Sequence, residues 1–344
     1  MPVWDAKMGN GFSTADIPDL AGKTFLVTGA NKGIGYQTAL HLAKHHARVI
    51  FACRDGKKAN LAMAKIRHTL APYSPQFEFL ELDLNSLAQV ASAARSLVDK
   101  GEQIDVLINN AGIMAVPYRL TQDGIESQFG CNHMGHFVFT TLLLPAIKKG
   151  TGRVVVLSSI AHKVTYSFGL TDKLEQVYVD PAAPNPAENG SAKHPSEAIY
   201  TATNAYGQSK LANLLFAKAL AARQPNLHVF AVHPGYVDTD LQRTGIKDAF
   251  GGVVATLSAA LSTVAAKNPV NGARTTLAAA TSPKLDNESG LYLVPYGKVA
   301  TPSKFGTDPE LQKRLWEMSI ELVRRILGEQ MVAEIERNVA RTVE

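Results

Sequence analysis

The stretch from Lys23 to Lys44 constrains the fold of this chain more than any other. An apolar strand, Phe25 to Val27, runs directly into the sequence T-G-A-N-K-G-I-G, and a helix-like segment follows from Tyr36. Strand, glycine-rich turn and helix in this order form the phosphate-binding turn of dinucleotide folds, because glycine permits a tight turn and a close approach of backbone to pyrophosphate. The turn therefore predicts a dinucleotide site, although an ordinary strand-to-helix turn with glycines has the same local pattern.

Apolar strands and helical segments alternate along the rest of the chain. After the first strand, further strands are expected at 49–52, 77–82, 104–108, 153–157, 228–232 and 291–294. Helices are expected between them at 36–46, 57–70, 85–98, 132–144 and 200–223. Buried strands that alternate with helices are typical of a doubly wound parallel α/β sheet, the Rossmann fold.

The chain has 344 residues, and we expect one dinucleotide-binding domain over 21–344, after an N-terminal extension, 1–20. The regular pattern lapses at about 164–199, between the fifth strand and the next helix, where prolines are frequent. We interpret this stretch as a surface insertion within the domain. Asp308-Pro309-Glu310 combines a capping residue, a first-turn proline and an acid, which predicts C-terminal helices over about 308–343.

Composition excludes several classes of function. The net charge is only +5 and the sequence contains no run of Lys or Arg, so no nucleic-acid partner is expected. Cys53 and Cys131 lack the spacing of a disulfide or metal framework, and the first residues lack a secretory signal, which together favour a cytoplasmic location and no metal. The uncharged stretch 249–266 is interrupted by Gly, Ser and Thr, so we expect a buried or substrate-covering helix there and no membrane span.

Residues after the second and third strands indicate which dinucleotide is bound. Arg54 stands near the position where an acid would bind the ribose 2′-hydroxyl of NAD, and an arginine there neutralises the 2′-phosphate of NADP. Lys32 adds a second cation, and Asp55 lies one step beyond Arg54. We therefore expect NADP, with solvated surface cations as the alternative. Asp83 ends the third strand, where it is expected to accept from the adenine amine, to cap the next helix, or both.

A tyrosine and a lysine four positions apart are the main candidates for chemistry. Tyr206 and Lys210 share one face of the expected helix 200–223. A free phenol has a pKa of about 10, and a nearby ammonium favours the phenolate, so Lys210 is expected to lower the pKa of Tyr206. An ordinary helix-surface pair has the same spacing.

Two further polar residues gain meaning beside this pair. Ser159 lies at the carboxyl end of the fifth strand, where open α/β sheets bind ligands, and its hydroxyl is expected to hold a carbonyl oxygen beside Tyr206. Asn132 interrupts a predicted helix as a poor helix former, which indicates a local task. The alternatives are a turn cap for Ser159 and a core amide for Asn132.

Together these segments resemble the short-chain dehydrogenase/reductase family. The matching pieces occur in the family's order between Thr28 and Thr239, and comprise the glycine turn, Asp83, N-N-A-G at 109–112, Asn132, Ser159, Tyr206, Lys210 and Pro234-Gly235. The sequences A-C-R-D (52–55), N-H-M-G-H-F (132–137), S-S-I-A-H (158–162) and S-K-L-A-N-L-L-F (209–216) resemble the retinol-dehydrogenase-like branch in particular. That branch usually prefers NADP, in agreement with Arg54.

The resemblance implies an NADP-dependent alcohol dehydrogenase or carbonyl reductase. Tyr206 would exchange a proton with the substrate oxygen while Ser159 orients that oxygen, and hydride would move between nicotinamide and the carbonyl carbon. Lys210 would bind the nicotinamide ribose, and Asn132 would support a water relay to it. The cofactor-binding residues implied are Gly29, Asn31, Lys32, Gly33, Ile34, Gly35, Arg54, Asp83, Leu84, Asn110, Ala111, Gly112, Tyr206, Lys210, Pro234, Gly235, Val237 and Thr239.

One departure and two alternatives remain. Ser159 and Tyr206 are much further apart in sequence than is usual in the family, so the insertion has to loop out, and both a homodimer and a monomer stay open. A non-catalytic cofactor sensor or scaffold is one alternative, against which the intact set of catalytic candidates argues. An NAD-dependent sugar-nucleotide epimerase or dehydratase is the other, but three residues separate the first two motif glycines here, where epimerases usually have two.

Overall fold

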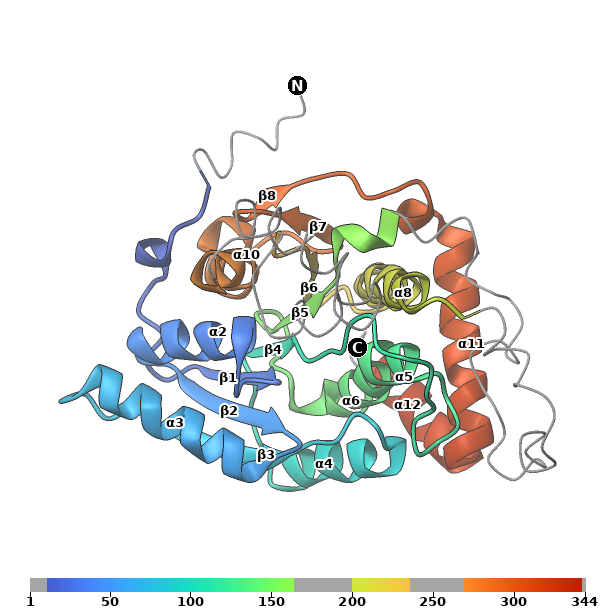
Figure 1. Ribbon diagram of the computed structural model, residues 1–344, viewed down its shortest axis with the longest axis horizontal. Coiled ribbons are helices and arrows are strands. Elements are labelled where there is room, and N and C mark those ends of the chain that lie inside the picture. Colours follow the sequence, from blue (N-terminus) through green and yellow to red (C-terminus); the bar gives the residue numbers. More distant parts are fainter. Residues whose placement is uncertain (1–10, 164–199, 236–268, 342–344) are drawn as a thin grey trace, which may run out of the picture.

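The computed structural model describes residues 11–163, 200–235 and 269–341, and its centre is one β-sheet (Figure 1). The strands are β1 (Thr24–Thr28), β2 (Arg48–Cys53), β3 (Phe77–Glu81), β4 (Val106–Asn109), β5 (Arg153–Leu157), β6 (His228–Val232), β7 (Leu291–Val294) and β8 (Lys298–Val299). They form an eight-stranded sheet in the order β3-β2-β1-β4-β5-β6-β7-β8. Every neighbouring pair is parallel except β7 and β8, which confirms the predicted doubly wound sheet.

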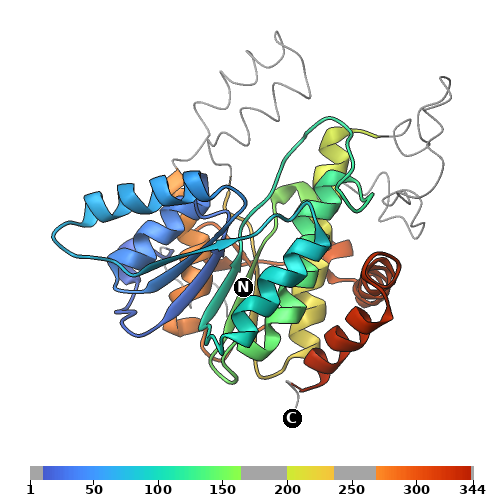
Figure 2. The ribbon, with the colours of Figure 1, turned by 90° about the horizontal axis from the view of Figure 1, so that it is seen from below.

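Helices cover both faces of this sheet (Figure 2). One face carries α2 (Gly33–Lys44), α3 (Gly56–Leu70) and α10 (Pro269–Thr281). The other carries α4 (Leu87–Asp99), the short α5 (Ser127–Phe129), α6 (Gly135–Leu143) and α8 (Ala202–Arg223). Beyond that layer lie α11 (Pro309–Leu327), which packs on α8, and α12 (Glu329–Arg341), which packs on α6.

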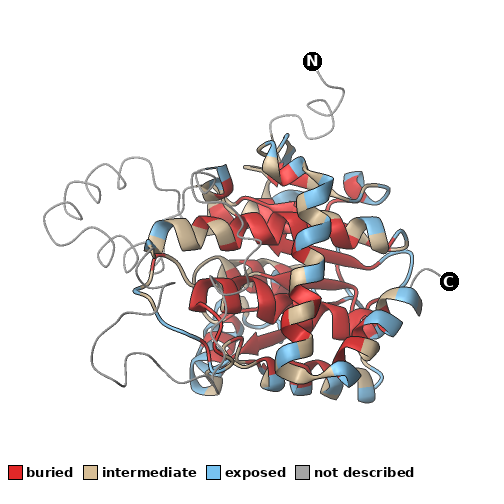
Figure 3. Cartoon of the chain, turned by 90° about the vertical axis from the view of Figure 1, so that its right-hand side faces the viewer, coloured by how far each residue is buried: buried red, intermediate tan, exposed pale blue. Residues whose placement is uncertain are grey.

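The strands are apolar throughout because they are buried on both sides. All five residues of β1 are buried, and so are all five of β5 (Figure 3). Leu26 and Ile50 pack into the core under α4, α6 and α8, whereas Val27 and Phe51 pack into the core under α2, α3 and α10. This double burial explains the absence of the polar alternation that marks half-exposed strands.

Local capping sets the helix ends, and it corrects one expectation. Asp308 caps α11 through the backbone N–H groups of Glu310 and Leu311, as its sequence predicts, and Gly328 ends that helix at φ +83°. At α4, however, the cap is Ser86 and not Asp83. The carboxylate of Asp83 instead accepts from Asn85 N at 3.1 Å, because the chain makes one more turn before the helix begins.

Two details of the sheet also differ from expectation. The fourth strand begins at Val106 and not at the expected Ile104, which forms only an isolated bridge with Ile147. The two-residue strand β8 has no signal in the sequence, since a pair of residues is too short to show a period.

The described part of the N-terminal extension packs against the domain. Phe12, Ile17 and Leu20 are buried in the core under α2 and α10. The N–H of Phe12 donates to Tyr296 O at 2.8 Å, and Arg274 Nε donates to Phe12 O at 2.7 Å. The guanidinium of Arg274 also lies 3.9 Å from the centre of the Tyr296 ring.

The expected insertion, 164–199, and the uncharged stretch 249–266 lie outside the described residues. Among the helices of residues 11–163, 200–235 and 269–341, none is both long and apolar enough to cross a bilayer.

Candidate active site

The glycine turn lies where the sheet reverses its winding. β1 pairs with β2 on one side and β4 on the other, and ligands of doubly wound sheets bind at this crevice. Gly29 and Gly33 have φ of +65° and +56°, in the left-handed region that favours glycine. A Cβ on Gly35 would lie against Gly29 O and Asn110 Nδ2. The turn is therefore a backbone cradle that only glycine leaves open, and its shape fits a pyrophosphate.

A second turn, at 109–112, is hydrogen-bonded to the first. The hydroxyl of Thr28 accepts from Asn110 N and Ala111 N, both at 2.9 Å, and lies 2.9 Å from His136 Nε2. Asn110 Nδ2 donates in return to Thr28 O at 2.8 Å. The ends of β1 and β4 thus form one continuous wall.

Two adjoining cavities, of ≈ 830 Å³ and ≈ 200 Å³, lie along this wall. They run from α3 to α8, and the glycine turn and Gly112 line both. A cleft of this size and length fits a dinucleotide. The expected residues that line it are Gly29, Asn31, Lys32, Gly33, Ile34, Gly35, Arg54, Asp83, Leu84, Asn110, Ala111, Gly112, Tyr206, Lys210 and Pro234. Gly235 follows the lining residue Pro234 at φ +90°, and Val237 and Thr239 lie outside the described residues.

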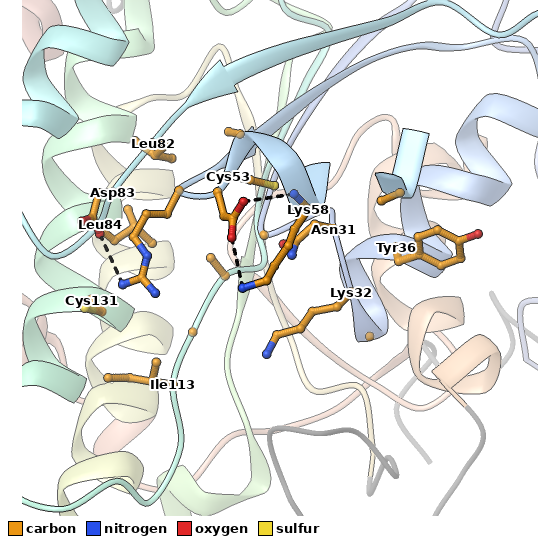
Figure 4. A pocket seen from close by; sticks show the side chains of 18 of the residues that line it. Asn31, Lys32, Tyr36, Cys53, Lys58, Leu82, Asp83, Leu84, Ile113 and Cys131 are labelled. Atoms are coloured by element: carbon orange, nitrogen blue, oxygen red, sulfur yellow. Dashed lines mark hydrogen bonds and ion pairs between the residues drawn. The ribbon is translucent and has the colours of Figure 1, made fainter. Parts of the chain in front are cut away.

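The end of the cleft beside α3 is rich in charge (Figure 4). Arg54 has a side chain that is 74% exposed, and its guanidinium lies 4.0 Å from Asp83 Oδ1. Asp55 caps α3 by accepting from Lys58 N at 3.0 Å, and Lys58 Nζ lies 3.0 Å from its other oxygen. These bonds hold the pKa of the Asp55 carboxyl below its usual value. Lys58 forms an ion pair with the Asp55 carboxylate. Arg54 and Lys32, which also line the cavity, are therefore not needed to neutralise Asp55.

The sequence reasoning missed one wall of this end. Lys58, Leu61 and Lys65 line the larger cavity from one face of α3, and Lys58 points into it in Figure 4. These residues are three and four positions apart, which is the signal that was present in the sequence, since residues at that spacing share one helix face. Other lining residues that were not anticipated are Tyr36, Ala52, Cys53, Asp55, Ala62, Leu82, Ile113, Cys131, Leu157 and Ser158.

At the end beside α8, the structure brings Tyr206 and Ser159 together despite their separation in sequence. The Ser159 hydroxyl lies near enough to the Tyr206 side chain to act on its pKa, and it accepts from Ala161 N at 3.2 Å. The turn-cap alternative for Ser159 is thus present alongside the contact with Tyr206.

Lys210 is held firmly beneath the tyrosine. Its Nζ donates to Leu157 O at 3.0 Å and lies 5.7 Å from the centre of the Tyr206 ring. Ser158 Oγ donates to Lys210 O at 2.7 Å, and Asn213 Nδ2 donates to Leu157 O at 2.9 Å. These bonds join the end of β5 to the middle of α8, so the helix cannot slide along the strand without breaking them.

The expected effect of Lys210 on the acidity of Tyr206 is wrong for this structure. Burial raises the pKa of Tyr206 to about 12, opposed by the hydrogen bond from Ser159. Burial likewise lowers the pKa of Lys210 to about 8. Loss of water around the phenol therefore sets the direction of the shift, and the ammonium of Lys210 is directed at Leu157 O.

Asn132 lies behind Gly112, in a π-helical turn over Gly130–Met134. Its Oδ1 accepts from Ile113 N at 2.8 Å, and its Nδ2 donates to Ile113 O and to Ser209 Oγ, both at 2.9 Å. Both ends of the amide are therefore used to join the chain after the second turn to α8. The wider π turn, which helix patterns do not reveal, aims the amide at these partners.

Comparisons with known proteins agree with this arrangement. A family model described as short chain dehydrogenase matches residues 23–170. The short-chain dehydrogenase TIC 32 A, chloroplastic, of Brassica napus is 36% identical over 313 residues, which cover 88% of this chain and 89% of that protein. Retinol dehydrogenase 13 of Mus musculus is 38% identical over 317 residues, covering 90% of this chain and 86% of that protein.

Among solved structures, one of an uncharacterised protein from Mycobacterium paratuberculosis resembles this chain with a TM-score of 0.67. It is 35% identical in sequence, and the match covers 91% of this chain and 98% of the other. The likeness therefore extends over most of the chain.

Proposed function

The chain belongs to the short-chain dehydrogenase/reductase family, in its retinol-dehydrogenase-like branch, and on that premise we propose an NADP-dependent enzyme that interconverts an alcohol and a carbonyl compound. The observation that carries the proposal is the contact of Ser159 with Tyr206 at one end of a cleft whose other end holds Arg54, Lys58 and Lys32. One end suits proton transfer and the other suits a phosphate.

The proton chemistry follows from the raised pKa of Tyr206 and the lowered pKa of Lys210. With a pKa of about 12, Tyr206 is protonated at neutral pH and is suited to donate its proton to a carbonyl oxygen that Ser159 holds by a hydrogen bond. Lys210, with a pKa of about 8, is mostly charged at neutral pH, and its ammonium would bind the nicotinamide ribose. The bound cofactor supplies the hydride for reduction and accepts it for oxidation.

The cofactor would be held by this chain's backbone and cations. The cradle of Gly29, Gly33 and Gly35 would receive the pyrophosphate at the amino end of α2. Arg54 and Lys32 would bind the 2′-phosphate, while Lys58 keeps the Asp55 carboxylate from repelling it. An apolar substrate is supported by the uncharged sequence 249–266, which follows the cofactor-binding segment.

The test is oxidation of NADPH and of NADH across a panel of aldehydes, ketones and quinones, with binding of both cofactors titrated alongside. We expect turnover with NADPH that exceeds turnover with NADH for at least one apolar carbonyl compound. Tight NADPH binding without turnover on any member would favour a sensor. Tightly bound NAD that copurifies with the protein would favour an epimerase.

We also propose a reducing, cytoplasmic compartment. Cys53 and Cys131 are both free thiols, as is usual where disulfides do not persist. Cell fractionation tests this location, and enrichment in an organelle fraction would contradict it.

A further inference from the structure

His162 makes a direct hydrogen bond to the candidate catalytic serine. It is fully buried in the 3-10 helix Ile160–Lys163, three residues after Ser159. Its Nδ1 lies 2.6 Å from Ser159 O, and the backbone N–H of Ser303 donates to its Nε2 at 3.2 Å. Because a backbone N–H only donates, Nε2 is the acceptor and Nδ1 carries the proton. The ring therefore donates to the serine carbonyl in its neutral form, and burial lowers its pKa, which keeps it neutral.

The partner of His162 leads back to the helix that carries Tyr206. Ser303 Oγ accepts from Gly306 N at 3.3 Å. Gly306 packs so closely on Leu214 of α8 that a Cβ there would overlap the leucine side chain. The ring of His162 also packs edge-on against Tyr292 of β7, with ring centres 5.3 Å apart.

We propose that His162 is a positioning residue, which sets the orientation of Ser159 by linking its carbonyl to the Ser303 segment and, through that segment, to α8. The carbonyl carbon and Cβ of Ser159 are attached to the same Cα, so holding the carbonyl holds the position of Cβ, from which the hydroxyl reaches Ala161 N and the Tyr206 side chain. The His162 bridge thus connects Ser159, after β5, to Leu214 of α8 through Ser303 and Gly306. This inference rests on the proposed role of Ser159 in catalysis.

Two substitutions separate the two halves of the bridge. His162→Asn places an amide N–H near the position of Nδ1, so it keeps the bond to Ser159 O and loses the acceptor for Ser303. His162→Gln places an amide oxygen near Nε2, so it keeps the bond from Ser303 and loses the donor to Ser159. We expect kcat to fall about tenfold in His162→Gln and no more than about threefold in His162→Asn, because misplacement by a fraction of an ångström is costly at a reacting group. The NADPH dissociation constant should not change in either.

A double variant distinguishes positioning from general stability. In a Ser159→Ala background, His162→Gln should cause no further loss of kcat, because there is no hydroxyl left to orient. His228→Gln is the matched control, since His228 also hydrogen-bonds backbone carbonyls, of Glu288 and Gly150, at the opposite end of the sheet. It should keep wild-type kcat, and thermal unfolding of all variants verifies that they fold.

Equal losses in the Asn and Gln variants, or an undiminished loss from His162→Gln in the Ser159→Ala background, would overturn the inference. Loss of turnover in Ser159→Ala together with an unaffected His162→Gln would overturn the inference alone. Wild-type turnover in Ser159→Ala would overturn the proposed role of the serine and, with it, the positioning role of His162.

Discussion

At the end of the cleft beside α8, Lys210 is 5% exposed and is hydrogen-bonded to Leu157 O. At the end beside α3, the side chains of Arg54 and Lys58 are 74% and 70% exposed. Proton transfer requires fixed distances, so the groups that transfer the proton are held by hydrogen bonds. Holding them in a buried site costs free energy of desolvation. Attraction of a phosphate requires only charge nearby, which mobile side chains supply in water. Proton transfer at the buried end therefore depends on single residues, whereas attraction of the phosphate at the exposed end is shared among several cations.

The largest effect is expected from Tyr206→Phe, at the buried end. Loss of the phenolic proton should lower kcat by about a thousandfold or more, because no other group replaces a positioned acid. The NADPH dissociation constant should stay within about twofold, since the ring remains. Steady-state kinetics and a fluorescence titration measure the two quantities. Tyr73→Phe, on an exposed loop, is the control, and a Tyr206→Phe enzyme with wild-type kcat would remove Tyr206 from the mechanism.

A second prediction concerns what the buried end costs in stability. The pKa of Lys210 is about 8 in the folded protein against 10.5 for a free lysine, so between these pH values the unfolded chain binds the extra proton. The free energy of unfolding should therefore rise with pH across this window, by about 3 kcal/mol relative to Lys210→Met. Urea unfolding without cofactor from pH 7.5 to 10.5 measures the gap. Parallel curves for the two proteins would mean that Lys210 titrates normally.

Arg54→Ala tests the exposed end. The NADPH dissociation constant should rise about tenfold and that of NADH by less than about twofold, because only NADPH carries the 2′-phosphate. Arg67→Ala is the matched control, because it removes the same charge from α3 at a position where the arginine lies over the ring of Phe77. Equal losses for both cofactors would show that Arg54 does not read the phosphate.

The smallest effect is expected from Lys58→Ala. It removes a cation and also leaves Asp55 free to repel the phosphate, so NADPH binding should weaken about threefold, and less as salt is raised. Its exposed neighbour Lys57 provides the control variant, Lys57→Ala. A loss from Lys58→Ala as large as that from Arg54→Ala would break the comparison, because the exposed end would then also depend on one residue.

Sequence patterns predicted the elements of this fold well, because its strands are buried on both faces and its turns need glycine. The strands 153–157 and 228–232 have the predicted bounds. The same patterns located Tyr206 and Lys210 on one helix. They did not reveal the π turn at Asn132, since a wider turn leaves no periodic signal in so few residues.

The error about Tyr206 has a different physical origin. Spacing along a helix indicates which charges are near each other, but burial depends on what the rest of the chain packs around them. The pKa of Tyr206 is raised because water is displaced from the phenol, a property of the assembled site. The wall formed by Lys58 and Lys65 was missed for a related reason, because α3 becomes part of the site only when it packs beside β2 and β3.

The contact of the N-terminal segment with the far end of the chain also has a consequence for synthesis. Phe12 leaves the ribosome long before its partners Arg274 and Tyr296, since 262 residues separate Phe12 from Arg274. At about 5–20 residues per second, the segment waits for tens of seconds before those partners exist. During this interval its apolar side chains, Phe12, Ile17 and Leu20, lack part of the surface that finally buries them. Docking of this segment is therefore a late step in the biogenesis of the protein, after the sheet beneath it has been made.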